Sequence, residues 1–200
     1  MSLKYALANE ESRGLMRSLM SQPYSFCTNC GCRGPKPLSE REFRCGRCGH
    51  RHFITPIPAA VAMILDANQR LLVLRRGHEP GLGLLGMPGG VIEADETGEE
   101  GAARETREEI GLHLPPEAFC YFVSLNNHYP FQGFVWPTID LFFLARVESF
   151  VGLQADPAEV MEWSPMPLDE VPLDQFAFRS NAEAVRRLRQ SLLQASPTSK

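Results

Sequence analysis

Short apolar runs and one segment with helical spacing predict the order of strands and helices along the chain. Residues 59–65 and 70–75 are almost continuously apolar and flank an Asp-Ala-Asn turn, so they predict two strands. Residues 98–110 instead repeat their apolar positions at helical spacing. The other predicted elements are strands at 118–125 and 139–147, a loop and strand at 156–163, and a helix at 180–194. The glycine-rich stretch 77–86 fits neither period and is a candidate substrate-facing loop.

Both predicted helices carry signals at their ends. Thr97 and Glu100 have the spacing of a capping box, and Gly111 stands where a left-handed residue would end the first helix. Its apolar face consists of Ala102, Ala103, Thr106 and Ile110. In the second helix, Ser180 is the expected N-cap with Glu183 at N3, and the exposed side is expected to hold Arg186, Arg187 and Arg189.

Three glutamates share one face of the helix at 98–110. Glu105, Glu108 and Glu109 stand at i, i+3 and i+4, where like charges repel by a few tenths of a kcal/mol per pair. A divalent cation would offset this repulsion, and carboxylate oxygens suit Mg2+ or Mn2+. Arg104 lies four residues before Glu108 and is placed to hold a carboxylate. A solvated helix rich in Glu and Arg is the alternative, and it is favoured for each of these residues taken singly.

The spacing of the whole segment from Gly90 to Leu112 decides against that alternative. It reads Gly90, five residues, Glu96, seven residues, then Arg-Glu-Thr-Arg-Glu-Glu-Ile-Gly-Leu. At average residue usage, seven such positions coincide by chance with a probability on the order of one in a million. The segment resembles the Nudix box, G-x5-E-x7-R-E-U-x-E-E-x-G-U with U a bulky aliphatic, and departs from it only at Thr106.

This resemblance implies a fold, a reaction and a set of roles. The expected fold is an α/β/α sandwich with a mixed sheet, and the expected activity is Mg2+-dependent hydrolysis of a nucleoside diphosphate linked to another group. The implied metal ligands are Glu105, Glu108, Glu109 and the carbonyl of Gly89. Arg104 is expected to orient the glutamates, and Glu96 to support the junction of loop and helix. Glu108 is the first candidate for general base, with Glu159 and Glu162 as competitors.

Four of the six cysteines have the spacing of a zinc ribbon. Cys27-x2-Cys30 and Cys45-x2-Cys48 are fourteen residues apart, and a glycine follows each pair. Four thiolates leave no open position on a tetrahedral ion, so the expected Zn2+ is structural. A disulfide framework is the alternative, which the absence of a secretory signal disfavours. The sixth cysteine, Cys120, lies in an apolar run and is predicted to be in the core.

Composition narrows the partners. The chain of 200 residues is 44% hydrophobic and 22% charged, with a formal net charge of −4, so general binding of nucleic acid is not expected. No apolar run reaches 18 residues and the N-terminus lacks a signal-peptide core, so we expect no membrane span and a cytoplasmic location. The expected organisation is a helical or flexible segment at 1–24, a zinc ribbon at 25–55, a hydrolase domain at 56–195 and a disordered tail at 196–200.

An aromatic stretch from 126 to 137, predicted to be a loop, offers candidates for substrate binding. Tyr129, Phe131 and Trp136 are the residues expected to stack on a base. A homodimer interface and simple packing under the loop are the alternatives that remain open.

The expected substrate is less defined than the reaction. A ribbon directly before a Nudix box resembles the NADH pyrophosphatase group, but the motif S-Q-P-W-P-F-P-x-S, which that group carries after the box, is absent there. Tyr129 lies 17 residues after Leu112, as a tyrosine does in diadenosine polyphosphate hydrolases. The substrate is therefore expected to be NAD(H)-like, ADP-ribose-like or a diadenosine polyphosphate. The alternative function is a nucleotide-sensing regulatory module whose ribbon binds nucleic acid or a protein partner.

Overall fold

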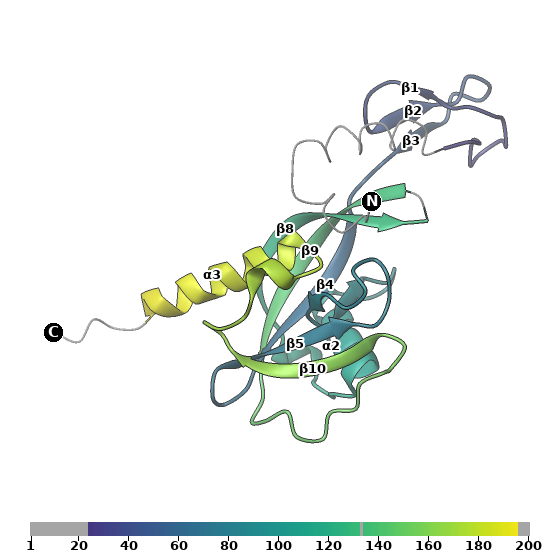
Figure 1. The fold of residues 1–200 in the computed structure, drawn as a ribbon. Helices are drawn as coiled ribbons and strands as arrows, with labels where there is room; N and C mark the ends of the chain where they lie inside the picture. The colour runs from purple at the N-terminus through teal and green to yellow at the C-terminus, as the bar shows by residue number, and fades with distance from the viewer. Residues whose placement is uncertain (1–23, 133, 196–200) are drawn as a thin grey trace. The chain divides into compact units, whose positions relative to one another are not determined.

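The computed structural model describes residues 24–132 and 134–195 (Figure 1). The segment expected before the ribbon therefore lies outside the described residues up to residue 23, as does the expected tail at 196–200. Backbone contacts divide the chain into two compact units. The first comprises Met1–Ile57 with His128–Pro137, and the second comprises Pro58–Asn127 with Thr138–Lys200.

The cysteine-rich segment forms a small three-stranded antiparallel sheet. Its strands are β1 (Lys36–Pro37), β2 (Glu42–Arg44) and β3 (Arg51–Phe53), in the order β1-β2-β3. Phe43 and His52 face each other across β2 and β3, and both are buried. The Tyr24 ring packs against both of these side chains. A few buried side chains thus form the whole interior of this sheet, which is a small core for some thirty residues.

The second sheet has seven strands, and its main path runs β10-β5-β4-β9-β8. Two short strands lie off this path, β6 beside β5 and β7 beside β4. In chain order the strands are β4 (Ile57–Leu65), β5 (Arg70–Arg76), β6 (Leu85–Gly86), β7 (Gly89–Val91), β8 (Cys120–Phe131), β9 (Phe134–Arg146) and β10 (Val160–Pro167). The helices are α2 (Gly98–Ile110) and α3 (Arg179–Ala195), with single 3-10 turns at Pro116–Ala118 and Leu173–Gln175.

The central strands are apolar on both faces because a helix covers each face. On β4, Val61, Met63 and Leu65 belong to one core cluster, which also contains the α3 residues Ala184, Val185 and Leu188. The alternate residues Ala60, Ala62 and Ile64 belong to the other cluster, with Ala102 and Ile110 of α2. Side chains of a strand alternate between faces, so a continuous apolar run is the pattern of a strand buried on both sides. The expected α/β/α sandwich is confirmed.

Helix α2 begins and ends where its sequence predicts. The Thr97 hydroxyl accepts the N–H of Glu100, and the Glu100 carboxylate accepts the N–H of Thr97. At the other end Gly111 has a left-handed φ of 67°, and its N–H donates to the Arg107 carbonyl. The capping box and the glycine C-cap therefore fix the length of this helix at thirteen residues.

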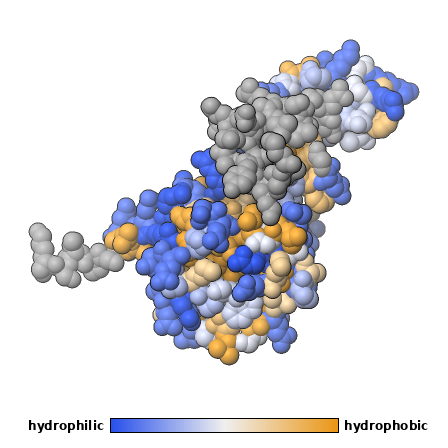
Figure 2. All heavy atoms as spheres, in the orientation of Figure 1, coloured by the Kyte–Doolittle hydropathy of each residue, from blue (hydrophilic) through white to orange (hydrophobic). Residues whose placement is uncertain are grey.

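Helix α3 differs from its prediction at two side chains. Ser180 lies inside the helix, which begins at Arg179, and its hydroxyl donates to the buried Asp140 of β9 at 2.6 Å instead of capping. Arg189 is half-buried rather than exposed, because its guanidinium donates to the carbonyls of Leu168 and Val171. Arg186 and Arg187 are exposed as expected, and the surface along α3 is mainly hydrophilic in the view of Figure 2. Long-range partners override the local signal at both positions.

The aromatic stretch 126–137 is a hairpin, so its prediction as a loop was wrong. Strand β8 continues to Phe131 and β9 starts at Phe134, with Gln132 at a left-handed φ of 49° between them. Aromatic and β-branched residues favour strands, and Pro130 is tolerated because β8 is the edge of the sheet. The core prediction for Cys120 was also wrong, since this first residue of the edge strand is exposed.

None of the helices in the described part of the chain combines the length and the apolar character that crossing a membrane requires.

Candidate active site

Two glycines allow strand β7 to lie directly against helix α2 and strand β4. Gly89 pairs with Val61 of β4, and a Cβ atom there would collide with the Ala60 carbonyl oxygen. A Cβ atom on Gly90 would collide with the Glu105 carboxylate. The glycine pair is therefore needed for close packing, and it brings the backbone of β7 within reach of the α2 carboxylates.

Arg104 lies at the centre of the α2 carboxylates. Its Nε and NH2 groups donate to both oxygens of Glu96 at 3.0 and 2.6 Å, which is a bidentate pair. Its NH1 group donates to Glu105 at 2.8 Å and to Glu108 at 3.2 Å, and NH2 also reaches the Val91 carbonyl at 3.1 Å. The hydrogen bonds from Arg104 lower the pKa of Glu96 and, in return, those bonds raise the pKa of Arg104. Arg104 thus fixes three carboxylates and the end of β7 in one network.

The two inward-facing glutamates are held at an electrostatic cost. Desolvation and, after it, the neighbouring Glu105 carboxylate raise the pKa of Glu109 to about 8, against the opposing effects of a long 3.4 Å hydrogen bond from the Gly89 N–H and of the Arg76 charge. Desolvation likewise raises the pKa of Glu105, against the effect of Arg104. A divalent cation between these oxygens would offset the desolvation of both carboxylates and the repulsion between them, so the donor set fits a hard metal ion.

The structure places the predicted glutamate ligands on one face of α2, but their carboxylates do not converge on a single point. Within residues 24–132 and 134–195, the four cysteines are the one group of three or more Cys, His, Asp or Glu whose ligand atoms all lie within 4.8 Å. Glu105 and Glu108 instead both accept hydrogen bonds from Arg104, and Glu108 accepts one from Arg107 as well. Glu108 is exposed, so its side chain has room to exchange these hydrogen bonds for a cation.

Two charged residues outside the box act on Glu109, and a third residue contacts one of them. The positive charge of Arg76 lowers the pKa of Glu109, and the negative charge of Glu159 raises it. His78 contacts Glu159, with 2.7 Å between Nε2 and Oε2. Glu162, the other base candidate, pairs with Arg75 at 3.4 Å. The sequence drew attention to Glu159 and to the loop that contains His78, but it gave no signal for Arg76.

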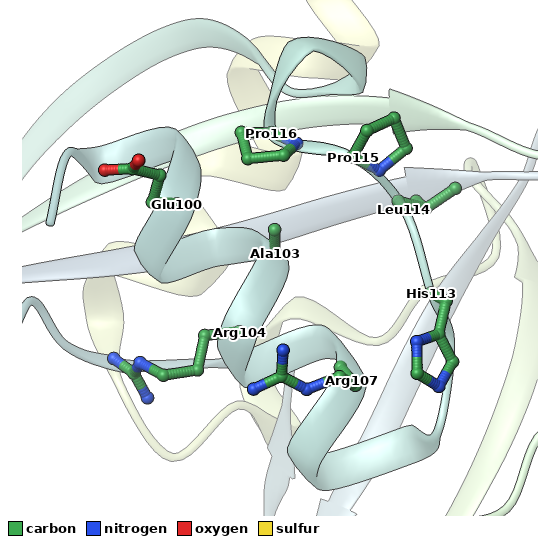
Figure 3. Close-up of a pocket in the computed structure, with 8 residues that line it drawn as sticks. All are labelled: Glu100, Ala103, Arg104, Arg107, His113, Leu114, Pro115 and Pro116. Atoms are coloured by element: carbon green, nitrogen blue, oxygen red, sulfur yellow. The ribbon is translucent and has the colours of Figure 1, made fainter.

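A shallow hollow of about 360 Å3 lies on another side of α2 (Figure 3). It is lined by the helix residues Glu100, Ala103, Arg104 and Arg107 and by the segment 113–116. Glu105 and Glu109 are not part of its lining. The hollow is therefore separate from the inward-facing carboxylates.

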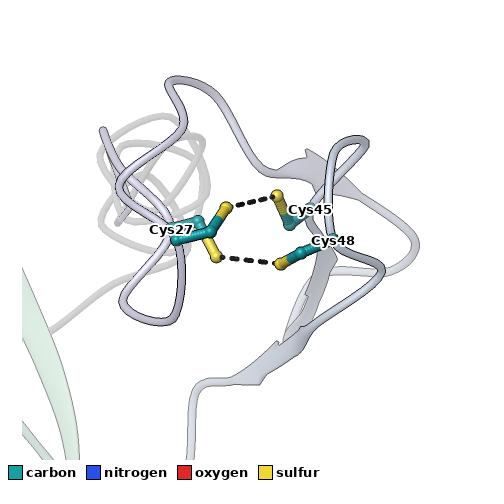
Figure 4. Close-up of side chains that lie close together, drawn as sticks. Cys27, Cys45 and Cys48 are labelled. Carbon is teal, nitrogen blue, oxygen red and sulfur yellow. Dashed lines mark hydrogen bonds between the residues drawn. The ribbon is translucent and has the colours of Figure 1, made fainter.

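The four cysteines converge from two loops of the small sheet, as Figure 4 shows for three of them. Their sulfur atoms lie within 4.8 Å of one another, and the pairs Cys27–Cys48 and Cys30–Cys45 are both 3.7 Å apart. Gly31 and Gly49 follow the two cysteine pairs with left-handed φ values of 68° and 74°. A tetrahedral ion with bonds of about 2.3 Å holds sulfurs about 3.8 Å apart. The cluster therefore has the spacing of a four-sulfur metal site.

The predicted aromatic residues occupy the tip of the β8–β9 hairpin. The Tyr129 and Phe131 rings are 6.3 Å apart, and the Trp136 ring lies 4.7 Å from that of Phe134. Phe131 is 51% exposed, and Tyr129 and Trp136 are half-buried. These rings thus form two pairs, one from each strand.

Comparisons with known proteins agree with this arrangement. The model of the NUDIX domain family matches residues 55–188. The NAD-capped RNA hydrolase NudC of Haemophilus influenzae (strain PittEE) is 27% identical over 165 residues, which cover 80% of this chain and 60% of that protein. The protein of the same name from Vibrio parahaemolyticus is 31% identical over 103 residues, which cover 52% of this chain and 39% of that protein. The crystal structure of a NUDIX hydrolase from Nitrosomonas europaea superimposes with a TM-score of 0.63 at 21% identity, covering 88% of this chain and 97% of that chain.

Proposed function

Because the chain belongs to the Nudix family, we propose that it is a divalent-metal-dependent pyrophosphohydrolase. Its substrate is a dinucleotide or another nucleoside diphosphate derivative, and a nucleoside monophosphate is one product. The chain spans 39% and 60% of the two relatives described above, so their activity is carried over as a proposal. Their names favour an NAD-like dinucleotide, either free or at the end of an RNA, over the other substrate classes.

The observation that carries this proposal is the set of carboxylates on α2. Desolvation raises the pKa values of Glu105 and Glu109 in spite of the positive charges of Arg104 and Arg76, and the Glu105 charge also raises the pKa of Glu109. Such a site is stabilised when a cation binds, and Mg2+ or Mn2+ prefers oxygen ligands of this kind. We assign Glu105, Glu108, Glu109 and the Gly89 carbonyl to it. A bound ion of this type neutralises charge on a diphosphate and acidifies a bound water.

The other residues of the box position these ligands. Arg104 spaces the glutamates through its NH1 group and anchors to Glu96 through Nε and NH2. Glu96 also accepts the Glu93 N–H at 2.8 Å, so it ties the loop before α2 to the helix. Glu108 is exposed, so water can reach its carboxylate, and it is one candidate for the base. Glu159 is the second candidate, because its charge acts on Glu109.

We further propose that the four-cysteine cluster holds one Zn2+ in a structural role. Four sulfur ligands leave no position for substrate or water. Hydrogen bonds from the His50 backbone N–H and from the Asn29 side-chain amide lower the pKa of Cys48 to about 6, which favours the thiolate form that binds metal. Metal analysis by mass spectrometry should find about one zinc per chain, and a protein without zinc that keeps its folded ribbon would contradict this assignment.

The aromatic residues Tyr129, Phe131 and Trp136 are proposed to stack on a base of the substrate. Replacing Phe131 by Leu should raise KM and leave kcat almost unchanged, because stacking acts on the bound substrate before and during the reaction alike. The alternative role of the hairpin is a homodimer interface. In that case the same variant would shift the mass measured by light scattering to that of a monomer.

Hydrolysis assays test the central proposal. The panel comprises NAD, NADH, NAD-capped RNA, ADP-ribose, diadenosine polyphosphates, CoA, nucleotide sugars and nucleoside triphosphates, each with Mg2+ and with Mn2+. We expect a nucleoside monophosphate product from at least one of them. Glu108→Gln should lower kcat by about 100-fold or more with the fold intact. The matched control is Glu99→Gln, nine residues or about 13 Å earlier along the same helix, which should keep full activity. Activity on nothing in this panel would refute the proposal.

A further inference from the structure

The loop after β5 and the turn before β10 are joined at a single residue, Glu159. The Gly77 N–H donates to the Glu159 carbonyl at 2.7 Å, and the His78 ring reaches the Glu159 carboxylate at 2.7 Å. A Cβ atom on Gly77 would lie 2.9 Å from the Glu159 carbonyl carbon, so the two backbones are in direct contact. The loop 77–86, a candidate for facing the substrate, is thus attached to the turn that carries Glu159.

The same turn is also attached to the end of α2. The Asp156 N–H donates to the Glu109 carbonyl at 2.8 Å, and the N–H groups of Glu159 and Val160 donate to the Asp156 carbonyl at 3.1 and 2.8 Å. Glu159 therefore lies two hydrogen bonds away from the backbone of a proposed metal ligand. Its charge acts on that ligand, since it raises the pKa of Glu109. The Glu162 carboxylate, three residues later, is instead paired with the Arg75 guanidinium.

The His78–Glu159 contact adds little to the fold. The two side chains are 40% and 48% exposed, and exposed ion pairs contribute little to stability. The loop already has other attachments, which include the Gly77 backbone bond, the Arg76 guanidinium bonded to the Pro80 carbonyl and the Arg75 guanidinium bonded to the Gly83 carbonyl. What the contact does fix is the direction of the Glu159 carboxylate, because a glutamate side chain with no partner would sample several rotamers.

The two neighbours of the His78 ring are both hydrogen-bond acceptors. Nδ1 lies 2.8 Å from the Glu79 carbonyl oxygen, and Nε2 lies 2.7 Å from the Glu159 carboxylate. The ring is thus held between these two acceptors, and its Nε2 edge faces the Glu159 carboxylate. In this arrangement the His78 side chain sets the orientation of the Glu159 side chain.

We propose that His78 is a positioning residue, which holds the Glu159 carboxylate beside the α2 carboxylates for hydrolysis. This inference rests on the proposed function. Glu159 supplies the carboxylate from the side of the site that α2 does not reach, and His78 sets its direction from the glycine-rich loop. The box supplies one side of the site, and residues 77–78 and 156–159 supply the other.

A double-mutant cycle tests the proposal with the full chain, saturating Mg2+ and the best substrate of the panel. His78→Ala should lower kcat by about 10- to 100-fold with KM within about three-fold of the wild type, because a displaced catalytic group slows the reaction without weakening binding. His78→Gln, which keeps an N–H donor, should recover part of the rate. In the double variant with Glu159→Gln, the His78 change should cost nothing further, because both act through the same carboxylate.

A surface ion pair on α3 provides the matched control. Arg187 contacts Glu183 at 3.0 Å and is exposed, and α3 covers the opposite face of the sheet from α2. Arg187→Ala should therefore leave kcat unchanged. An unimpaired His78→Ala variant, or effects of His78→Ala and Glu159→Gln that multiply, would overturn the positioning role while leaving the proposed function intact. Lack of hydrolysis by the wild type would overturn both.

Discussion

Removing Arg104 should destabilise the protein far more than removing its neighbour Arg107. Arg104→Ala deletes five donated hydrogen bonds, of which two go to Glu96 and one each to Glu105, Glu108 and the Val91 carbonyl. Arg107→Ala, one turn later on the same helix, deletes an exposed pair with Glu108. The two substitutions are chemically identical, so their difference measures the environment of each side chain.

The magnitude follows from burial. The side chains of Arg104, Glu96 and Glu105 are 18%, 14% and 15% exposed, so removing the cation leaves two poorly hydrated carboxylates without a positively charged partner. Breaking a buried pair in this way costs about 3–5 kcal/mol, and the remaining exposure places the expected loss near the lower end, at about 3 kcal/mol. For Arg107, which is 51% exposed, the expected loss is below about 0.5 kcal/mol.

Urea unfolding followed by the fluorescence of the two tryptophans measures both losses, since Trp163 packs against the core cluster that contains Ala102 and Ile110 of α2. The pH dependence gives a second reading. Arg104 lowers the folded-state pKa of Glu96, so the stability from this pair is complete above the unfolded pKa of about 4.3 and is lost as the pH falls through the folded value. The difference between wild type and Arg104→Ala should therefore narrow below about pH 4. Equal losses for Arg104→Ala and Arg107→Ala at pH 7 would refute this reasoning.

Further predictions concern three other groups. The folded pKa of Glu109, about 8, lies above its unfolded value, so the metal-free wild type should lose stability as the pH rises from about 4 to 8. Glu109→Gln should escape about 1–3 kcal/mol of that loss when unfolding is measured in a chelator at pH 5 and pH 9. Cys48→Ser should remove the zinc and increase amide exchange in 24–57, with the seven-stranded sheet still protected. Ser180→Ala should cost about 1–2 kcal/mol in thermal unfolding, since Asp140 loses a donor in a buried position, whereas the exposed Ser191→Ala on the same helix should be neutral.

Local signals predicted the elements whose ends are determined by neighbouring residues. Helix α2 ends where the capping box and Gly111 place its ends, because each of those bonds joins residues three or four apart. Strands β4 and β5 agree with the apolar runs at 59–65 and 70–75 within two residues. Their continuous apolar character arises from burial on both faces, and the sequence alone contains that information.

Elements that depend on distant partners were predicted less well. The stretch 126–137 was predicted as a loop, and only the pairing of β8 with β9 shows that it is a hairpin, in which the edge strand β8 tolerates Pro130. Ser180 has the sequence of an N-cap, but its hydroxyl turns to Asp140, forty residues away in the chain. Cys120 lies in an apolar run but is exposed, because it begins the edge strand.

The sequence by itself determined the family, the carboxylates at i, i+3 and i+4 and the two cysteine pairs. These features are spacings between residues along the chain, so they do not depend on how the rest of the chain packs. Only the tertiary structure decided which groups face them. Val160 pairs with Arg76 across β10 and β5, and this register brings Glu159 to Gly77 and His78. A shift of one residue would turn β10 side chains to the other face of the sheet. The register of β10 against β5 is determined by burial on both faces of the sheet. The position of Glu159 beside Gly77 and His78 therefore depends on the packing of the whole domain.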